Sequence, residues 1–259
     1  MSIQWDSPDS KVKVNCKDNT FEADIVLVTC SLGVLKEKAD QLFYPHLPQK
    51  KREAIEVYYF IFFIKFNSIL INVATCFKSL GYGTVNKIYL EFRQKWWNEG
   101  WGGVNFLTHS ANRSGAWFEA ILGFYTVHNQ PNLLEGWITG SAARVVETLP
   151  ESELLEKCCS LLRGSVGSSF DYEEPIGVIR SQWHSNPNFR GSYSFRSLES
   201  KERNIWASDL AEPVVDSKGV AKLLFAGEAT HSHRYSNVHG AVETGWREAD
   251  RIIQLIPNS

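Results

Sequence analysis

The chain has 259 residues, a net charge of -2 at pH 7 and a pI of about 6.4. Hydrophobic residues make up 43% and charged residues 22%, which excludes a disordered chain and indicates one large or two modest globular domains. The weak net charge predicts no broad attraction to nucleic acid or to anionic lipid, so neither is expected as a partner.

The cysteines and the two ends of the chain indicate a cytoplasmic protein. The five cysteines are odd in number and form no C-x-x-C, which favours reduced thiols over a disulfide framework or a zinc site. The first residues, MSIQWDSPDSKVK, hold no apolar signal-peptide core, and the last, QLIPNS, hold no peroxisomal or retention signal.

Residues 12–29 predict a β-hairpin. Apolar and polar side chains alternate over residues 12–16, residues 17–20 favour a turn, and residues 23–29 are apolar on both faces. A strand of the last kind is expected to be buried in a layered sheet. It ends at 30-CSLGVL-35, which is consistent both with a ligand-holding loop of an open α/β sheet and with an ordinary strand–loop connection.

The most apolar passage of the chain is 57-VYYFIFFIKFNSILINVATCFK-78. A membrane span is disfavoured because Lys65, Asn67 and Asn72 lie near its centre, where polar groups are costly. The passage has no clean helical period and is too long for one strand. The sequence therefore predicts no membrane anchor here.

A strand that carries a lysine is predicted over residues 84–92. Val85, Lys87 and Tyr89 share one face of this strand, and mainly apolar side chains share the other. A lysine among apolar and aromatic neighbours either extends its amine to water or holds a desolvated functional amine. The position of Lys87 is consistent with both.

The middle of the chain predicts a core rich in aromatic residues, followed by two helices. Most of the aromatic residues between Trp96 and Tyr125 are expected to be buried, since large rings dominate cores by area. The helices are predicted over residues 137–149 and 151–163. The second has an apolar stripe, and Gly164 is expected to end it.

The tail predicts a strand, a polar loop and a helix. The strand covers residues 223–226, Glu228 follows it directly, and the helix begins at about Gly240. A carboxylate at a strand end suits sugar-like hydroxyls, and a helix N-terminus suits an anionic or electron-rich group. Small residues at helical spacing are expected to let this helix approach a sheet closely: Ala241, Gly245, Ala249 and Ile253.

Two other interpretations of the tail compete with a ligand site. His231, His233 and His239 with Glu228 could bind a metal and serve a hydrolase, but their spacing matches no standard zinc pattern and no cysteine assists them. A plain strand–loop–helix is also consistent with the pattern, but it leaves the dense polar and aromatic loop unexplained.

The tail FAGEATHSHRYSNVHGAVETGWREADRI resembles the C-terminal flavin-binding segment of FAD-dependent amine oxidases, most closely the polyamine and spermine oxidase branch. Three earlier segments resemble further parts of the same family in the same order: ADIVLVTCSLGVLK, GTVNKIYLEF and QWHSNPNFRGSYSF. The resemblance covers most of the chain. It implies flavin-dependent oxidation of spermine, spermidine or acetylated forms by O2, giving an aldehyde, an amine and H2O2.

The resemblance also implies an α/β fold of mixed α+β character. A Rossmann-like FAD-binding domain, residues 1–45 and 208–259, would be interleaved with a substrate domain built on a mixed sheet, residues 46–207. Such a fold opens with a strand, G-x-G-x-x-G and a helix, and the chain contains no such motif. The N-terminal half that holds the pyrophosphate is therefore expected to be absent. An inactive fragment or interaction module, unable to hold FAD alone, stays open as an alternative.

The resemblance assigns roles to individual residues. Lys87 matches the catalytic lysine that holds a water against flavin N5, and Tyr193 matches an aromatic residue that lines the amine path. Residues implied to contact FAD are Glu228 at the sugar chain and Trp183, Asn237, Val238 and Ala241 at the ring. Asn237 departs from the tyrosine or threonine of the family, which bears on substrate selectivity.

The resemblance gives the apolar passage another interpretation. Joining Glu56 to Ser79 produces KREAIESLGYGTVNKIYLEF, which continues the family pattern without a break. Residues 57–78 are therefore expected to be an aberrant, aggregation-prone insert, consistent with an in-frame retained intron. It is expected to bulge from the substrate domain just before the strand of Lys87.

Overall fold

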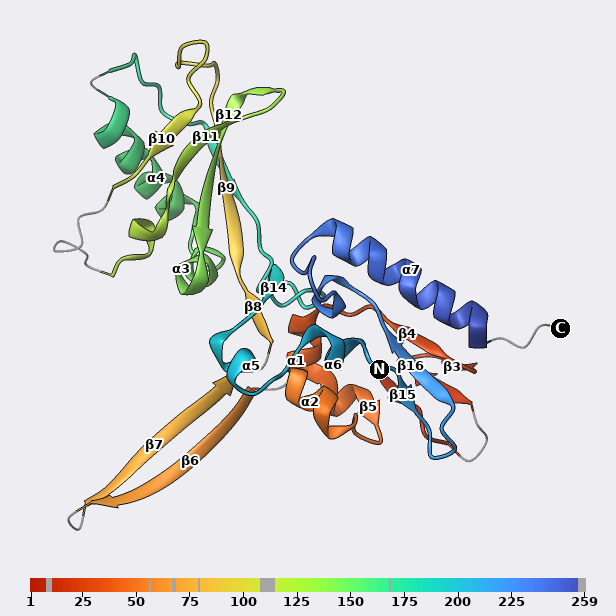
Figure 1. Ribbon diagram of the computed structural model, residues 1–259. Helices are drawn as coiled ribbons and strands as arrows, with labels where there is room; N and C mark the ends of the chain where they lie inside the picture. The colour runs from red at the N-terminus through yellow and green to blue at the C-terminus, as the bar shows by residue number, and fades with distance from the viewer. Residues whose placement is uncertain are drawn as a thin grey trace. The chain divides into compact units, whose positions relative to one another are not determined.

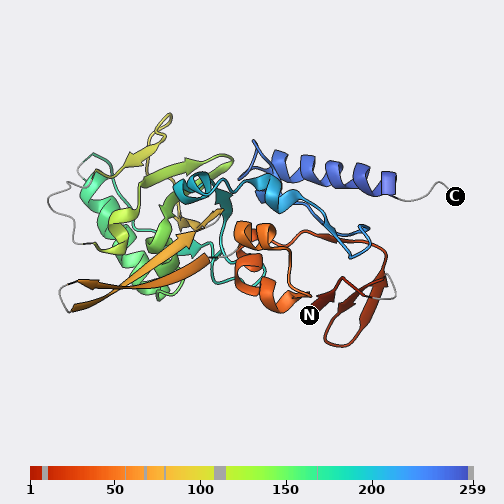
Figure 2. The same ribbon diagram turned by 60° about the horizontal axis from the view of Figure 1, so that its bottom comes forward.

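The structure, a computed structural model, divides into two compact units. Unit 1 comprises Met1–Tyr82 and Asn188–Ser259, and unit 2 comprises Gly83–Pro187. Both contain helices and sheets, which confirms the mixed α/β class (Figures 1 and 2). The structure describes residues 1–7, 11–55, 57–66, 69–78, 80–107, 115–167 and 169–255.

The first sheet of unit 1 contains the predicted hairpin. Its strands are β1 (Ser2–Gln4), β2 (Val12–Asn15), β3 (Thr20–Ala23) and β5 (Phe43–Tyr44), in the order β3-β2-β1-β5. Strands β2 and β3 pair antiparallel, with Val12 opposite Ala23, and β1 and β5 pair parallel. The hairpin prediction is confirmed for residues 12–23.

A second sheet of unit 1 corrects the prediction of one strand over residues 23–29. Strand β3 ends at Ala23, and β4 (Val26–Val28) begins a three-stranded sheet with β16 (Ala221–Phe225) and β15 (Val214–Val215). The break falls at Asp24, which lies between the two strands. Its carboxylate pairs with the amine of Lys11 at 2.6 Å. The prediction of burial on both faces is also wrong, because Val28 is buried while Leu27 is exposed.

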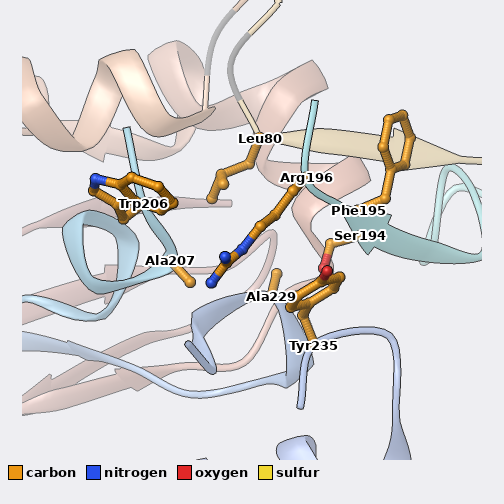
Figure 3. Close-up of a pocket in the computed structure, with 8 residues that line it drawn as sticks. All are labelled: Leu80, Ser194, Phe195, Arg196, Trp206, Ala207, Ala229 and Tyr235. Carbon is orange, nitrogen blue, oxygen red and sulfur yellow. The ribbon is translucent and has the colours of Figure 1, made fainter. Parts of the chain in front are cut away.

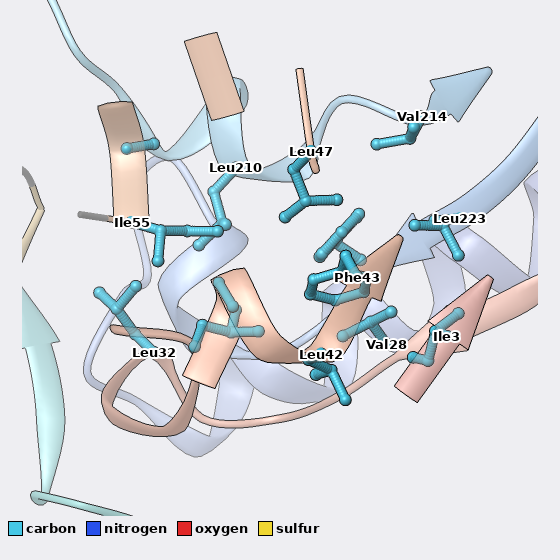
Figure 4. Packing of buried hydrophobic residues seen from close by; sticks show 14 of the residues in the cluster. Ile3, Val28, Leu32, Leu42, Phe43, Leu47, Ile55, Leu210, Val214 and Leu223 are labelled. Atoms are coloured by element: carbon cyan, nitrogen blue, oxygen red, sulfur yellow. The ribbon is translucent and has the colours of Figure 1, made fainter. Parts of the chain in front are cut away.

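The described residues of unit 1 also form five α-helices: α1 (Leu32–Leu42), α2 (Gln49–Ile55), α5 (Leu198–Glu202), α6 (Ala207–Ala211) and α7 (Val238–Leu255). Ser31 caps α1, accepting a hydrogen bond from the amide of Val34 at 3.2 Å. The core between helices and strands includes Leu32, Phe43 and Leu223 (Figure 4).

Helix α7 begins at Val238, close to the predicted start, but it buries a different face from the one expected. The row Ala241, Gly245, Ala249 and Ile253 does not face the sheet, since Ile253 is 69% exposed and a Cβ at Gly245 would meet nothing within 4 Å. The buried row is Gly240, Thr244 and Glu248. A shift of one position turns a helix by about 100°, so the small-residue row points away from the core.

Specific contacts select the buried row of α7. The hydroxyl of Thr244 accepts a hydrogen bond from the amide of Gly227 at 3.0 Å. A Cβ at Gly240 would lie 2.0 Å from the carbonyl oxygen of Arg234, so only glycine lets the preceding loop cross here. Glu248 is fully buried and accepts a hydrogen bond from Arg247.

The apolar passage forms a hairpin that occupies a sheet of its own. Strands β6 (Val57–Phe66) and β7 (Ile69–Lys78) pair antiparallel from Val57 opposite Lys78 to Phe66 opposite Ile69. Figure 1 shows this ribbon as a long two-stranded projection. Among the described residues, every helix is too short or too polar to cross a membrane.

Unit 2 is a five-stranded sheet with two α-helices. Its strands are β9 (Val85–Glu91), β10 (Gly103–Asn105), β11 (Gly123–Val127), β12 (Gln130–Thr139) and β13 (Gly177–Arg180), in the order β10-β11-β12-β9-β13. All of these pairs are antiparallel. A short 3-10 helix, η2 (Trp117–Ala120), precedes β11.

The two helices of unit 2 follow β12. The prediction of a helix over residues 137–149 is wrong for 137–139: these complete β12, and α3 (Gly140–Val146) begins only at Gly140, whose φ of 68° makes the corner. Helix α4 (Glu151–Val166) confirms the second helix but continues past Gly164, which lies beside open space.

The predicted aromatic core of unit 2 is confirmed in part. Of the aromatic residues between Trp96 and Tyr125, Trp97 and Phe124 are buried, and Trp97 lies edge-to-face on the buried Phe92 with ring centroids 5.6 Å apart. The others that pack against this cluster are only partly buried: Trp96, Trp101, Phe106, Trp117 and Phe118. This core fixes the sheet that carries Lys87.

Candidate functional site

Lys87 lies on a half-buried face of the unit 2 sheet, the lysine face, which consists of Lys87, Tyr89, Glu135 and Trp137. Lys87 lies opposite Trp137, and Tyr89 opposite Glu135, across the β9–β12 ladder. The neighbours of Lys87 on the strand, Asn86 and Ile88, point to the buried side. The alternation predicted for residues 84–92 is therefore confirmed.

The amine of Lys87 is held by one carboxylate and one ring. Its Nζ lies 2.9 Å from Oε2 of Glu135 and 4.6 Å from the centre of the Trp137 ring. Burial lowers the pKa of the Lys87 ammonium, but the hydrogen bond and charge of Glu135 outweigh it, so the pKa lies above its ordinary value. Lys87 is therefore a partly exposed, ion-paired ammonium, so neither of the two predicted environments, an amine in water or a desolvated amine, describes it fully.

Glu135 is the hub of the lysine face, and the sequence did not single it out. Its Oε2 also accepts the hydroxyl of Tyr89 at 2.6 Å, and its Oε1 accepts the indole N–H of Trp137 at 2.6 Å. Burial raises the pKa of this carboxyl, but the donated hydrogen bonds outweigh it and keep the pKa below its ordinary value. Only the β9–β12 register brings these residues together.

The segment that carries Trp183 is tied to the strand of Lys87. The hydroxyl of Ser181 accepts the amide of Lys87 at 2.9 Å and donates to the side-chain oxygen of Asn86 at 2.9 Å. The same Asn86 oxygen lies 3.5 Å from the amide nitrogen of Trp183. Two residues predicted to flank the flavin, Lys87 and Trp183, are thus brought together in unit 2.

Glu147, directly after helix α3, anchors this segment. It is 4% exposed, and its carboxylate accepts hydrogen bonds from Asn86 at 2.6 Å, the amide of His184 at 2.9 Å and the amide of Ser185 at 2.6 Å. Burial raises its pKa, but these hydrogen bonds outweigh burial and hold the pKa below its ordinary value. Glu147 thereby fixes the backbone that follows Trp183.

The other predicted site residues lie in unit 1, around Glu228. Glu228 opens a 3-10 turn, η3 (Glu228–Thr230), just after β16, as predicted. It accepts the amide of Ser194 at 3.0 Å, the hydroxyl of Ser194 at 2.6 Å and the amide of Ser236. Glu228 therefore joins β14 (Tyr193–Phe195), which pairs with β8 (Gly81–Gly83), to the loop before α7.

These bonds place the remaining predicted residues. Tyr193 precedes Ser194 and is 38% exposed, and Asn237 follows Ser236 and is also exposed. Val238, 78% exposed, and Ala241 lie on the first turn of α7. The N-terminus of an 18-residue helix, with its free amides, is thus bordered by small and apolar exposed side chains.

Of the tail histidines, His231 stabilises the loop through its side chain. His231 bonds Glu243 on α7 at 2.8 Å through Nε2, and its Nδ1 accepts the amides of His233 and Arg234. Over the residues that the structure describes, no three His, Cys, Asp or Glu side chains gather as metal ligands. The metal interpretation therefore has no geometric support.

A small pocket adjoins the Glu228 hub. Figure 3 shows the side chain of Arg196 reaching between the rings of Trp206 and Tyr235, with its guanidinium 5.2 Å and 5.4 Å from their centres. Ser194, which bonds Glu228, lines the same pocket. The remaining lining residues are Leu80, Phe195, Ala207 and Ala229. The guanidinium of Arg196 thus makes cation–π contacts with both rings.

In unit 1, the residue types suit one end of FAD: the exposed start of α7 suits the electron-rich edge of a flavin ring, and Tyr193 offers an exposed ring. In unit 2, Trp183 offers another exposed ring. Glu228 suits a hydroxyl-rich chain in type, although three donors of the protein already occupy it. The glycine-rich cradle for a pyrophosphate has no counterpart in the sequence.

Comparisons with known proteins identify the family of the chain. The chain matches the family "Flavin containing amine oxidoreductase" over residues 1–253. It is 36% identical to the human (Homo sapiens) peroxisomal N(1)-acetyl-spermine/spermidine oxidase, covering 94% of this chain and 45% of that protein. It is 31% identical to a possible lysine-specific histone demethylase 1 of Drosophila melanogaster, covering 93% of this chain and 25% of that protein.

Solved structures agree on the fold. A putrescine oxidase bound to putrescine superposes with a TM-score of 0.67 at 18% identity, covering 98% of this chain and 47% of that one. A cyclohexylamine oxidase from Brevibacterium oxydans superposes with a TM-score of 0.62 at 15% identity, again covering 98% and 47%. The chain thus spans about half the length, or less, of each of these relatives.

Proposed function

The chain belongs to the family of flavin-containing amine oxidoreductases, and we propose on this basis that it serves the FAD-dependent oxidation of polyamines. The substrate would be spermine, spermidine or an acetylated form. With water and O2 it would yield an aldehyde, a shorter amine and H2O2. The observation that carries the proposal is the lysine face, where an ammonium lies among aromatic rings on the strand that resembles the active-site strand of this family.

When bound, the flavin supplies the chemistry by accepting a hydride from the carbon beside the amine nitrogen and passing the electrons to O2. The residues of this chain would position and polarise. The first turn of α7, with Asn237, Val238 and Ala241, would meet the ring with its free amides. Glu228 would hold the sugar chain, and Trp183 would pack on the ring.

Lys87 would act through its charge and its protons. With the flavin bound, the ammonium of Lys87 would hold a water near the ring and supply protons for the reduction of O2. The fixed positive charge would also repel a protonated amine nitrogen and so favour the neutral form, which is the one that can be oxidised. Tyr193 would line the path of the alkyl chain, and Asn237 would contribute to the choice of substrate.

A second candidate function is that of an inactive fragment or interaction module on the same fold. One observation favours it: three donors of the protein already occupy Glu228, the carboxylate expected to bind the sugar chain of FAD. Such a protein would fold without holding FAD by itself.

Purification of the full chain separates the two functions. The oxidase is expected to be yellow, with stoichiometric flavin absorbance, and to release H2O2 from spermine, spermidine or N1-acetylspermine. A colourless protein that unfolds cooperatively and releases no peroxide would establish the inactive module instead. In a flavin-loaded sample, Lys87→Met should slow flavin reoxidation while the control Lys157→Met should not. Identical stopped-flow traces for Lys87→Met and the wild type would refute the role of Lys87.

The proposed place of action is the cytoplasm, with small amines and O2 as the only partners and no nucleic acid or membrane. The human relative is named a peroxisomal enzyme, so cell fractionation with peroxisomal markers is the direct test. Co-sedimentation with peroxisomes would overturn the cytoplasmic placement.

A further inference from the structure

Glu135 is the most heavily bonded side chain of the lysine face. Both of its oxygens are engaged: one by the Lys87 ammonium and the Tyr89 hydroxyl, the other by the Trp137 indole. Its side chain is 16% exposed, against 37% for Lys87. A carboxylate with three donors at 2.6–2.9 Å is held in one orientation.

We propose that Glu135 is the positioning residue of Lys87: it holds the amine as an ammonium over the ring of Trp137, so that Lys87 presents a fixed charge rather than a free base. The structure assigns this role through contacts within unit 2 alone. Its consequence for catalysis rests on the proposed function, because only there does Lys87 face a flavin.

The surroundings of Lys87 support this assignment. On its own strand, Tyr89 faces the same carboxylate and Glu91 is exposed at the strand end. On β11, Tyr125 lies opposite Glu135 but bonds Asn105 at 2.6 Å. On β13, the residue opposite Tyr89 is the uncharged Ile179. Of these neighbours, Glu135 supplies the charge within contact of Lys87.

Glu135 could instead be a subsite for the ammonium of a substrate. The geometry disfavours this, since a substrate ammonium would have to displace the lysine, the tyrosine or the indole from the carboxylate. Displacement would leave a partly buried donor without its acceptor, and a carboxylate already held by three donors gains little from a fourth. The carboxylate of Glu135 therefore pairs with Lys87 rather than with a substrate ammonium.

The test is competitive chemical labelling of lysine amines in the full chain, read by mass spectrometry as a function of pH. Only the neutral amine reacts, so the midpoint of the labelling curve reports protonation. In the folded wild type, the midpoint of Lys87 should lie above its midpoint in the denatured chain. An equal or lower midpoint in the folded protein would overturn the proposal without any variant.

Variants sharpen the test. Glu135→Gln removes the charge at nearly constant shape and should lower the midpoint of Lys87, with severalfold faster labelling near that midpoint. Glu135→Asp keeps the charge and should restore part of the difference. The matched control is Glu156→Gln, because Lys157 has a similar exposure of 39% and pairs with Glu156 at 3.2 Å. This control should leave Lys87 unchanged, and an unchanged Lys87 in Glu135→Gln would overturn the proposal.

A second readout separates this inference from the proposed function. If the protein binds flavin, Glu135→Gln should move the pH profile of flavin reoxidation to lower pH, and Glu156→Gln should not. A shift in labelling without a shift in the reoxidation profile would keep the ion pair but reject the flavin-facing role of Lys87. The absence of both shifts would reject the positioning role itself.

Discussion

At the scale of single residues, unit 2 depends on two carboxylates that are stabilised in different ways. Glu135 is paired with a cation and shares a half-buried face with it. Glu147 is buried, and one side-chain amide and two backbone amides donate to its oxygens. Hydrogen bonds to a charged group are worth about 1.5–3 kcal/mol each, so the loss of Glu147 should be felt throughout the segment of Trp183.

The first prediction concerns Glu147→Gln. At pH 7 the variant should be less stable by about 1–3 kcal/mol, because a glutamine turns an N–H₂ toward amides that need an acceptor. Because the pKa of Glu147 is depressed in the folded state, ionised Glu147 stabilises the fold above the ordinary glutamate pKa, and this contribution is lost as the pH falls from there through the lower pKa of the folded state. The variant should therefore lose less stability on acidification than the wild type does.

Urea unfolding at pH 7 and at pH 4, followed by tryptophan fluorescence, measures both effects. The exposed Glu156→Gln is the control, with no expected change. An acid dependence in Glu147→Gln as steep as in the wild type would contradict the assignment.

At the scale of elements, helix α7 shows how a single buried row decides an orientation. The row Gly240, Thr244 and Glu248 is buried against the rest of unit 1. The row of small residues one position later is not. The exposed side of α7 carries Val238, Val242, Trp246 and Ile253.

The second prediction compares two glycines of α7. Gly240→Ala should lower the melting temperature strongly, because its Cβ would fall 2.0 Å from the carbonyl of Arg234 and displace the loop of Asn237. Gly245→Ala has open space and should be neutral or stabilising by up to about 1 kcal/mol, the gain of alanine over glycine in a helix. Thermal unfolding followed by circular dichroism gives the comparison. Equal effects of the two substitutions would show that the buried row is not the one described.

The third prediction concerns the β6–β7 hairpin. Its first and last residues, Val57 and Lys78, are cross-strand partners, so their Cα atoms lie about 5 Å apart. Deletion of residues 57–78 should therefore close with little rearrangement. Soluble yield should rise, because the deletion removes a long, strongly apolar strand pair.

Gel filtration of both forms and sequencing of transcripts across this region provide the measurements. A transcript that lacks these codons would support the retained-intron interpretation. A deletion that removes the cooperative thermal unfolding of unit 1, which contains the hairpin, would show instead that the hairpin is needed for folding.

At the scale of the whole molecule, the two units differ in how the chain builds them. Unit 1 is assembled from two distant stretches, which meet where β16 pairs with β4. Unit 2 is one continuous stretch with its own core, in which Ile88, Phe124 and Leu154 are fully buried. The predicted functional domains, 1–45 with 208–259 and 46–207, remain a prediction.

The fourth prediction is that residues 83–187 fold alone, because their core is complete within the stretch. The isolated fragment should unfold in one cooperative transition. Leu154→Ala in the fragment should cost about 2–5 kcal/mol, while Leu122→Ala, at a 57% exposed position, should cost little. A fragment that unfolds without cooperativity would show that unit 2 depends on unit 1.

Local patterns predicted much of this protein. The alternation over 84–92, the stripe of helix α4 and the strand before Glu228 are all confirmed, because each depends on neighbours a few residues apart. The family was predicted from sequence segments that resemble those of the family and follow in the same order. The comparisons confirm the family. These features are properties of the sequence itself.

Tertiary structure alone decided the rest. The partner of Lys87 lies on a different strand, and only the register of β12 against β9 brings Glu135 to it. The buried row of α7 depended on a loop crossing at Gly240 that no helical period encodes. The strand end at Thr139 depended on pairing with β9, which overrode a helical pattern. In each case the deciding contact comes from outside the local pattern, so it depends on packing rather than on local preference.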